Sequence, residues 1–190
     1  AISPSSPHTH YITHFRYPTE GGFVSYLKKF VPLGSLKLNH ALVSLDPRTR
    51  RLCFSNGIVA YYDALVSSVP LPDLVCMIAD APKDVLEASQ RLACSTCVLV
   101  NVGVERDDLS DAHMTYFYDE DICFTRLSFP HMLSARNVPQ GTGSIQAEVY
   151  FSDKYKPLTG SPDDWIEPVM TDLKRCGLLH EDDRILFSNA

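Results

Sequence analysis

The chain has 190 residues, 45% apolar and 21% charged, which is ordinary for a folded protein in water. Its net charge of −6 argues against nucleic acid or an anionic membrane as the main partner. No apolar run approaches the roughly 18 residues needed to span a bilayer, and the N-terminus lacks the basic flank and apolar core of a signal peptide. We therefore expect a cytoplasmic protein with no membrane span and no nucleic-acid partner.

Residues 1–15 form a Ser- and Pro-rich leader, which we expect to be extended. It contains the motif 8-HTHYITH-14, but no acidic side chain accompanies the histidines, and we predict no metal site. The motif 94-CSTC-97 begins an apolar run, and no second C-x-x-C follows that would complete a zinc site. We expect reduced cysteines inside the core, in particular at three positions with apolar neighbours: Cys53, Cys97 and Cys123.

The stretch 16-RYPTEGGFVSYLKKF-30 places a glycine pair before apolar residues at helical spacing. The pattern predicts a short amphipathic helix over 21–31 that ends at Pro32. Paired glycines at a helix start allow a close backbone approach, and the helix N-terminus suits a phosphate. A tight turn made by Gly21 and Gly22 is the alternative interpretation.

From residue 36 the apolar period changes to two, which indicates β-strands. The pattern predicts strands at 41–45, 51–55 and 58–62, with a turn at 46-DPRTR-50 and a hairpin at 56-NG-57. These strands form an antiparallel meander, because the connections leave no room for a crossover helix.

The run 64-ALVSSV-69 is nearly all apolar and ends at Pro70, which is typical of a strand buried on both faces. Such a strand needs further strands beside it, and the chain supplies no βαβ partner. The run therefore resembles one strand of a larger sheet.

In the second half, the pattern predicts a helix at 82–92 and then strands at 96–105, 113–119, 122–130 and 144–152. A capped helix from Ser161 to Gly177 follows them. The fold class is therefore α+β: an antiparallel sheet with flanking helices, plus a β-meander lobe. We divide the chain into a leader (1–15), a meander lobe (16–75) and a sheet domain (76–190).

The order Y-P-x-x-G-G, meander, Y-D-A-L-V-S-S-V-P-L-P resembles the flavin-dependent amine oxidoreductase superfamily. The stretch 114-MTYFYDEDICFTRLSFP-130, followed by S-I-Q-A-E-V, resembles the substrate domain of its UDP-galactopyranose mutase branch. Together these matches cover roughly residues 16–187. The G-x-G-x-x-G fingerprint of such proteins is absent. The resemblance therefore implies an incomplete FAD-binding domain, a missing N-terminal dinucleotide-binding half as partner, and FAD bound only in a full-length protein.

The resemblance also implies cofactor contacts for residues of the meander lobe. Gly21 and Gly22 would approach the flavin, Leu42 and Val43 would border its adenine end, and Ser68 and Pro70 would lie beside the dinucleotide. A purely structural role, in a turn or in the core, is the alternative for each of them.

Arg126 lies in an apolar strand, so its charge must be exposed, paired with a carboxylate, or directed at an anionic ligand. In the mutase branch, Tyr and Arg at these spacings hold the diphosphate of the substrate. The resemblance thus implies a substrate site of Tyr116, Tyr118, Phe124 and Arg126. We expect Arg126 beside Tyr116 at the mouth of a hollow, with no carboxylate nearby. The rival interpretation is a salt bridge to Glu148.

No nucleophile–base pair is recognisable, since His113 and His131 have no Ser or Cys partner at a known spacing. In flavoproteins the cofactor carries the chemistry. We therefore expect the substrate-binding region of an FAD-dependent oxidoreductase or mutase, inactive by itself. Its substrate would be a nucleotide sugar, or a related amine or alcohol, in polysaccharide or lipopolysaccharide synthesis. The alternative is a stand-alone, non-catalytic binding module that presents an aromatic strand.

Overall fold

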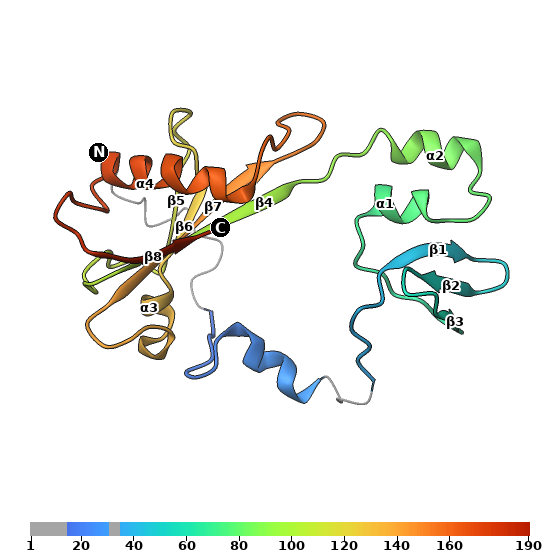
Figure 1. Cartoon of the computed structure of the whole chain (residues 1–190), viewed down its shortest axis with the longest axis horizontal. Helices are drawn as coiled ribbons and strands as arrows, with labels where there is room; N and C mark the ends of the chain where they lie inside the picture. The colour runs from blue at the N-terminus through green and yellow to red at the C-terminus, as the bar shows by residue number, and fades with distance from the viewer. Residues whose placement is uncertain (1–14, 31–34) are drawn as a thin grey trace. The chain divides into compact units, whose positions relative to one another are not determined.

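The computed structural model describes residues 15–30 and 35–190. They form two compact units, each taken here by itself (Figure 1). The first, named the sheet unit, comprises residues 15–30, 96–151 and 155–190. The second, named the meander unit, comprises residues 35–95 and 152–154.

The sheet unit is built on five antiparallel strands in the order β5-β6-β7-β4-β8. Its two central strands are nine residues long and pair along their whole length, from Thr96 opposite Phe151 to Val104 opposite Gly143. The strands are β4 (Thr96–Val104), β5 (Met114–Tyr116), β6 (Arg126–Ser128), β7 (Gly143–Phe151) and β8 (Ile185–Asn189).

One face of this sheet carries the core, because strand side chains alternate between faces. Val100 and Val102 of β4 share that face with Ala147 and Val149 of β7, and all four are fully buried. Helix α4 (Ile166–Arg175) packs on them and contributes Val169 and Leu173 to the same cluster (Figure 1). Each buried aliphatic side chain stabilises the unit by about 1.5–3 kcal/mol. The opposite face, named the open face, is left for polar and aromatic side chains.

The predicted helix that begins after Ser161 is confirmed, although its first turn, η3 (Pro162–Trp165), is a 3₁₀-helix. Ser161 Oγ accepts from the Asp163 N–H at 3.2 Å, and Asp164 Oδ2 accepts from the Ser161 N–H at 2.7 Å. Gly177 follows the helix with a φ of 72°, which suits glycine. Two shorter helices, α3 (Pro130–Leu133) and η2 (Ala135–Asn137), connect β6 to β7.

The meander unit contains the predicted three-stranded meander, in the order β1-β2-β3. Its strands are β1 (Leu42–Asp46), β2 (Arg51–Phe54) and β3 (Val59–Tyr61). The Asn-Gly hairpin is confirmed, with Gly57 at a φ of 82°. Helix α2 (Lys83–Ser89) lies within its predicted range, whereas the short α1 (Leu71–Cys76) was not predicted.

One prediction for the first half is wrong. The run 64–69 is not a strand, and Val66 is 97% exposed. A strand buried on both faces needs neighbours on both sides, and no described strand pairs with this run. The helix predicted after the glycine pair is present within its predicted range, as a 3₁₀-helix, η1 (Phe23–Lys29), and its Phe23 is 70% exposed. Its predicted end at Pro32 lies outside the described residues.

The second half needs smaller corrections. Strands β5 and β6 keep only three residues each, because the chain turns away between Phe117 and Thr125. Strand β8 was not predicted, since all five of its residues are exposed and carry no alternating pattern. All six cysteines are free thiols, and Cys97 is exposed on the open face, so its predicted place in the core is wrong. None of the described helices is long and apolar enough to cross a membrane.

Candidate functional site

The open face carries a row of side chains that crosses four strands. Tyr116 of β5 pairs with Arg126 of β6, Arg126 with Glu148 of β7, and Glu148 with Leu99 of β4. Neighbouring strands lie about 4.8 Å apart, so opposite residues on one face are in reach of each other. The sheet register therefore brings together two of the predicted substrate residues, Tyr116 and Arg126.

Arg126 forms an ion pair with Glu148, whose side chain is only 6% exposed. The guanidinium Nη2 donates to Glu148 Oε1, and the hydroxyl of Tyr150 donates to Oε2 at 2.5 Å. The hydrogen bond to Glu148, followed by the one to Tyr116, raises the pKa of Arg126. The expectation of a guanidinium with no carboxylate nearby is therefore wrong, because the register places Glu148 directly opposite.

Part of the Arg126 guanidinium is not used by Glu148. Its Nη1 lies 3.5 Å from the hydroxyl oxygen of Tyr116, at the outer limit of a hydrogen bond, and its Cζ lies 5.9 Å from the centre of that ring. Its Nε is buried and has no hydrogen-bond partner among the described residues. The side chain is 33% exposed, so Nη1 is the group best placed to donate to a ligand.

The two other predicted substrate residues lie apart from this row. Tyr118 follows β5 and is 87% exposed. Phe124 is 1% exposed and packs edge-on against Phe117, with ring centres 4.9 Å apart. The chain bends at Thr125, so Phe124 does not continue the alternation of β6 and enters the core instead.

The row has further members that the prediction missed, Tyr150 and Cys97, which are register partners on β7 and β4. Alternation along 144–152 places Tyr150 on the face of Glu148, and this signal was available in the sequence. The hydrogen bond to Glu148 raises the pKa of Tyr150 to about 12. Burial, and then the charge of Glu148, raises the pKa of the Cys97 thiol. A raised thiol pKa disfavours the thiolate, the form in which a cysteine acts as a nucleophile.

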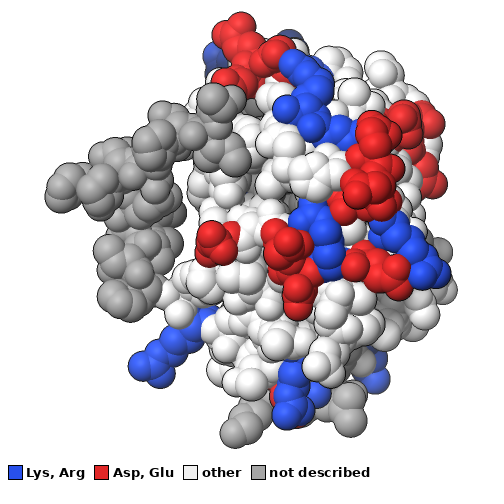
Figure 2. Space-filling view, turned by 90° about the vertical axis from the view of Figure 1, so that its left-hand side faces the viewer, with Lys and Arg blue, Asp and Glu red and all other residues white. Residues whose placement is uncertain are grey.

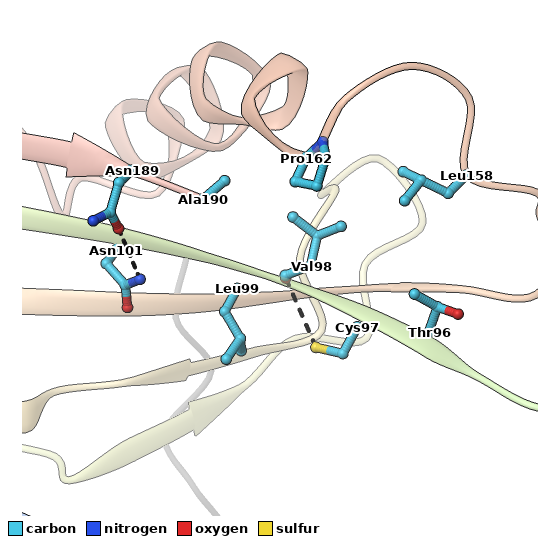
Figure 3. Close-up of a pocket in the computed structure, with 9 residues that line it drawn as sticks. All are labelled: Thr96, Cys97, Val98, Leu99, Asn101, Leu158, Pro162, Asn189 and Ala190. Atoms are coloured by element: carbon cyan, nitrogen blue, oxygen red, sulfur yellow. Dashed lines mark hydrogen bonds between the residues drawn. The ribbon is translucent and has the colours of Figure 1, made fainter. Parts of the chain in front are cut away.

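A cavity of about 500 Å³ lies along β4 (Figure 3). Cys97, Leu99 and Asn101 point to one side of the strand and Val98 to the other, while the side chains of Asn101 and Asn189 are hydrogen-bonded at 2.9 Å. Its lining residues are Thr96, Cys97, Val98, Leu99, Asn101, Leu158, Pro162, Asn189 and Ala190. Arg126 and Tyr116 do not line it, so the expected hollow beside Arg126 is not found there.

The residues predicted to contact a flavin are divided between the two units. Gly21 and Gly22, in the sheet unit, have φ values of 78° and 64°. This backbone geometry is enough to explain why glycine occupies both positions, without a flavin nearby. In the meander unit, Leu42 is half-buried, and three residues are exposed: Val43, Ser68 and Pro70. The predicted FAD contacts stay predictions.

Charged side chains do not gather into a single basic surface on the face in Figure 2, where acidic and basic residues are interspersed. Several of them are paired, such as Arg175 with Asp121 at 2.5 Å and Lys174 with Glu181 at 3.0 Å. Within residues 15–30 and 35–190, no cluster of His, Cys, Asp and Glu could hold a metal ion. The histidine motif at 8–14 lies outside the described residues.

Comparisons with known proteins yield structural neighbours only. No protein-family model and no curated protein matches the chain. A crystal structure of reduced UDP-galactopyranose mutase superposes with a TM-score of 0.78 and 24% identity, covering 91% of this chain. The PF1083 protein of Pyrococcus furiosus superposes with a TM-score of 0.58 and 14% identity, covering 79% of this chain.

The chain spans 38% of the length of the mutase chain and 36% of the length of the PF1083 chain. The resemblance inferred from the residues 114–130 is thus confirmed at the level of fold. The chain has two antiparallel sheets with few helices, and its fold is similar to that of part of UDP-galactopyranose mutase.

Proposed function

We propose that the chain is the substrate-binding region of an FAD-dependent mutase or oxidoreductase that acts on a nucleotide sugar. The observation that carries the proposal is the pairing of Tyr116 with Arg126 on the open face, within a fold similar to that of UDP-galactopyranose mutase. A role in polysaccharide or lipopolysaccharide synthesis is part of the same proposal.

In this proposal the anionic diphosphate contacts the exposed side of the row. Arg126 Nη1 donates to a phosphate oxygen, and the hydroxyl of Tyr116, 3.5 Å from Nη1, donates to the same group. The exposed Tyr118 offers a further hydroxyl next to β5. Because Glu148 neutralises much of the charge of Arg126, the attraction to the anion is weaker than that of an unpaired arginine.

Glu148 has a positioning role in this arrangement. Its carboxylate accepts from Arg126 and Tyr150 at once and is nearly buried, so it fixes the orientation of both side chains on the open face. A fixed guanidinium loses less conformational entropy when it binds a ligand. The drawback is that Glu148 partly neutralises the positive charge of Arg126.

FAD, in this proposal, belongs to the full-length protein, where it would supply the redox or nucleophilic chemistry. A dinucleotide-binding half outside this chain would hold the pyrophosphate. Gly21, Gly22, Leu42, Val43, Ser68 and Pro70 are proposed to border that cofactor when the missing half is present. No reaction step is assigned to the described residues, whose part is to bind and orient the substrate.

Titration of the chain with UDP, followed by calorimetry or amide NMR shifts, tests the proposal. Arg126→Ala is expected to abolish binding. Glu148→Gln keeps an acceptor for Arg126 but removes the competing negative charge, so it is expected to tighten binding about two- to tenfold. The matched control is Arg48→Ala, which removes an exposed arginine paired with Asp80 in the meander unit and is expected to have no effect.

A stand-alone binding module is the second candidate, and the exposed aromatic side chains of the open face favour it. Tyr116 is 46% exposed, Tyr150 38% and Phe187 50%. If the folded wild-type chain binds no UDP and the Glu148→Gln variant binds none either, this candidate is preferred. The length of the natural reading frame before Ala1 also separates the two, because only the flavoprotein needs a Gly-rich strand–helix unit upstream.

A further inference from the structure

One edge of strand β4 is only half covered. On one side β7 pairs with all of Thr96–Val104, whereas on the other side β8 pairs only with Asn101–Val104. No described strand lies beside Thr96–Val100 on this second side, and no backbone hydrogen bond from the described loops and helices reaches these residues. This half of β4, named the β4 edge, is therefore a free sheet edge that lies in line with β8.

Two residues of the β4 edge direct their backbone groups to the uncovered side. Successive residues of a strand bond alternately to the two neighbouring strands. The N–H of Glu105, just after β4, donates to the carbonyl oxygen of Arg184 at 3.0 Å, on the β8 side. Leu99 and Cys97 lie an even number of positions before Glu105, and the ladder between β4 and β7 is regular throughout. Their N–H and C=O groups therefore face the β8 side too, where no described strand receives them.

The cavity of about 500 Å³ beside β4 lies along this edge (Figure 3). Val98 points to the side of Leu158 and Pro162, and Leu99 points to the opposite side. No Lys, Arg, Asp, Glu or His is among the described residues that line the cavity, so it suits an uncharged segment. Unpaired N–H and C=O groups on a sheet edge are a template for another strand. The β4 edge and the cavity thus offer both the hydrogen-bonding groups and the space that an added strand needs.

We propose that the β4 edge receives the short segment that directly follows Ala190 in a longer polypeptide, as a continuation of β8. Asn189 and Ala190 border the cavity, so a segment in line with β8 enters it without a turn, whereas a separate peptide or a second copy must end or turn beside Ala190. The inference rests on the proposed function in one respect, that the natural polypeptide is longer than this chain, which spans 38% of the length of the mutase chain.

The register determines what this segment must contain. Because Asn101 lies opposite Asn189, the first and third residues after Ala190 face Leu99 and Cys97 and must donate their backbone N–H groups, so neither is expected to be proline. The second residue lies opposite Val98 and is expected to be apolar, since its side chain points toward the apolar wall of the cavity. A reading frame that stops at Ala190, or that has proline at either bonding position, would overturn the proposal.

Amide exchange, followed by NMR, tests the docking itself. The 190-residue chain is compared with the same chain extended by about ten residues of its natural reading frame, which is enough to span the β4 edge. The amides of Leu99 and Cys97 are expected to exchange at least about tenfold more slowly in the extended chain. The amides of Val98 and Val100 face β7 and are the internal control, equally slow in both chains. Equal exchange of Leu99 and Cys97 in the two chains rules the proposal out. Protection that instead grows with the concentration of the 190-residue chain assigns the edge to a second copy and also rules it out.

A variant and a matched control complete the test. Pro162→Asp puts a carboxylate into the cavity wall, at a first helical turn where acids are favourable, and is expected to lower the protection of Leu99 in the extended chain about two- to tenfold. Pro157→Asp changes an exposed proline outside the lining and should leave the protection unchanged. An equal effect of the two variants would contradict the assigned position of the segment.

A peptide replaces the extended chain if that chain does not fold. The same ten or so residues are then added to the 190-residue chain at about 1 mM, and amide shifts at Leu99 and Cys97 are expected. Absence of shifts counts against the proposal. None of these experiments involves UDP, and neither Arg126 nor Tyr116 lines the cavity, so the UDP titration decides the proposed function separately.

Discussion

Arg126 and Glu148 lie directly opposite each other on β6 and β7, and the guanidinium of one donates to the nearly buried carboxylate of the other. The pair occupies the centre of a row that also contains Tyr116 and Tyr150. Both the stability of the sheet unit and its proposed anion site depend on this contact, so variants of these residues must be judged by stability as well as binding.

Arg126→Ala is expected to destabilise the sheet unit by roughly 2–4 kcal/mol. The change leaves the carboxylate of Glu148, 6% exposed, without its cation, and the figure is set below that of a fully buried pair because Arg126 is 33% exposed. Urea unfolding at pH 7 measures the loss. A change below about 0.5 kcal/mol, as at ordinary surface positions, would show that the pair is not structural.

The hydroxyl of Tyr150 is expected to lose its proton only at high pH. Its hydrogen bond to Glu148 raises its pKa to about 12. Because the folded pKa lies above the unfolded value of about 10, the stability due to this bond is fully present below pH 10 and is lost as the pH rises through about 12. NMR of the tyrosine ring carbons can follow the ionisation. Glu148→Gln should lower the Tyr150 pKa, and an unchanged value would contradict the assigned cause.

Asp172 of α4 is expected to stabilise the sheet unit only above about pH 4. Burial favours a higher pKa, but the N–H of Cys123, donating at 2.8 Å, and Arg175, donating at 2.7 Å, lower it overall. Since the folded pKa is depressed, the stabilisation is present above the unfolded pKa of about 3.9 and is lost as the pH falls through the folded value.

The Asp172→Ala variant tests this role. It leaves the N–H of Cys123 without its acceptor and is expected to cost about 1–3 kcal/mol at pH 7. Unfolding experiments at pH 7 and pH 3 should show the difference between variant and wild type shrinking at the lower pH. Asp107→Ala, which removes an exposed acid of the sheet unit outside helices and strands, serves as a comparison; it should show no such trend. An equal loss at both pH values would mean that the carboxylate charge is irrelevant.

The purified 190-residue chain is expected to contain no FAD. In the proposed function, the half that holds the pyrophosphate of FAD lies outside this chain. The absorption spectrum should therefore lack the visible bands of a flavin, and added FAD should not be retained on gel filtration. Stoichiometric FAD in the purified chain would overturn this expectation.

The sequence predicted local structure well where local chemistry decides it. The Asn-Gly hairpin, the cap at Ser161 and the alternation along β7 each arise from neighbouring residues, and the structure contains all three. The resemblance to the mutase branch was also readable, since it rests on the spacing of residues 114–130, and the fold supports it.

Tertiary structure decided which side chains meet at the site and which enter the core, because both depend on which strands become neighbours. The register of β6 on β7 placed Glu148 opposite Arg126, and the bend at Thr125 sent Phe124 into the core. The run 64–69 also shows that composition alone does not decide whether a strand forms. Its apolar residues favour a buried strand, but a strand needs neighbouring strands to complete its backbone hydrogen bonds. No described strand pairs with this run. The sequence by itself determined which residues favour strands, turns and caps, whereas contacts between distant strands determined which side chains meet at the site.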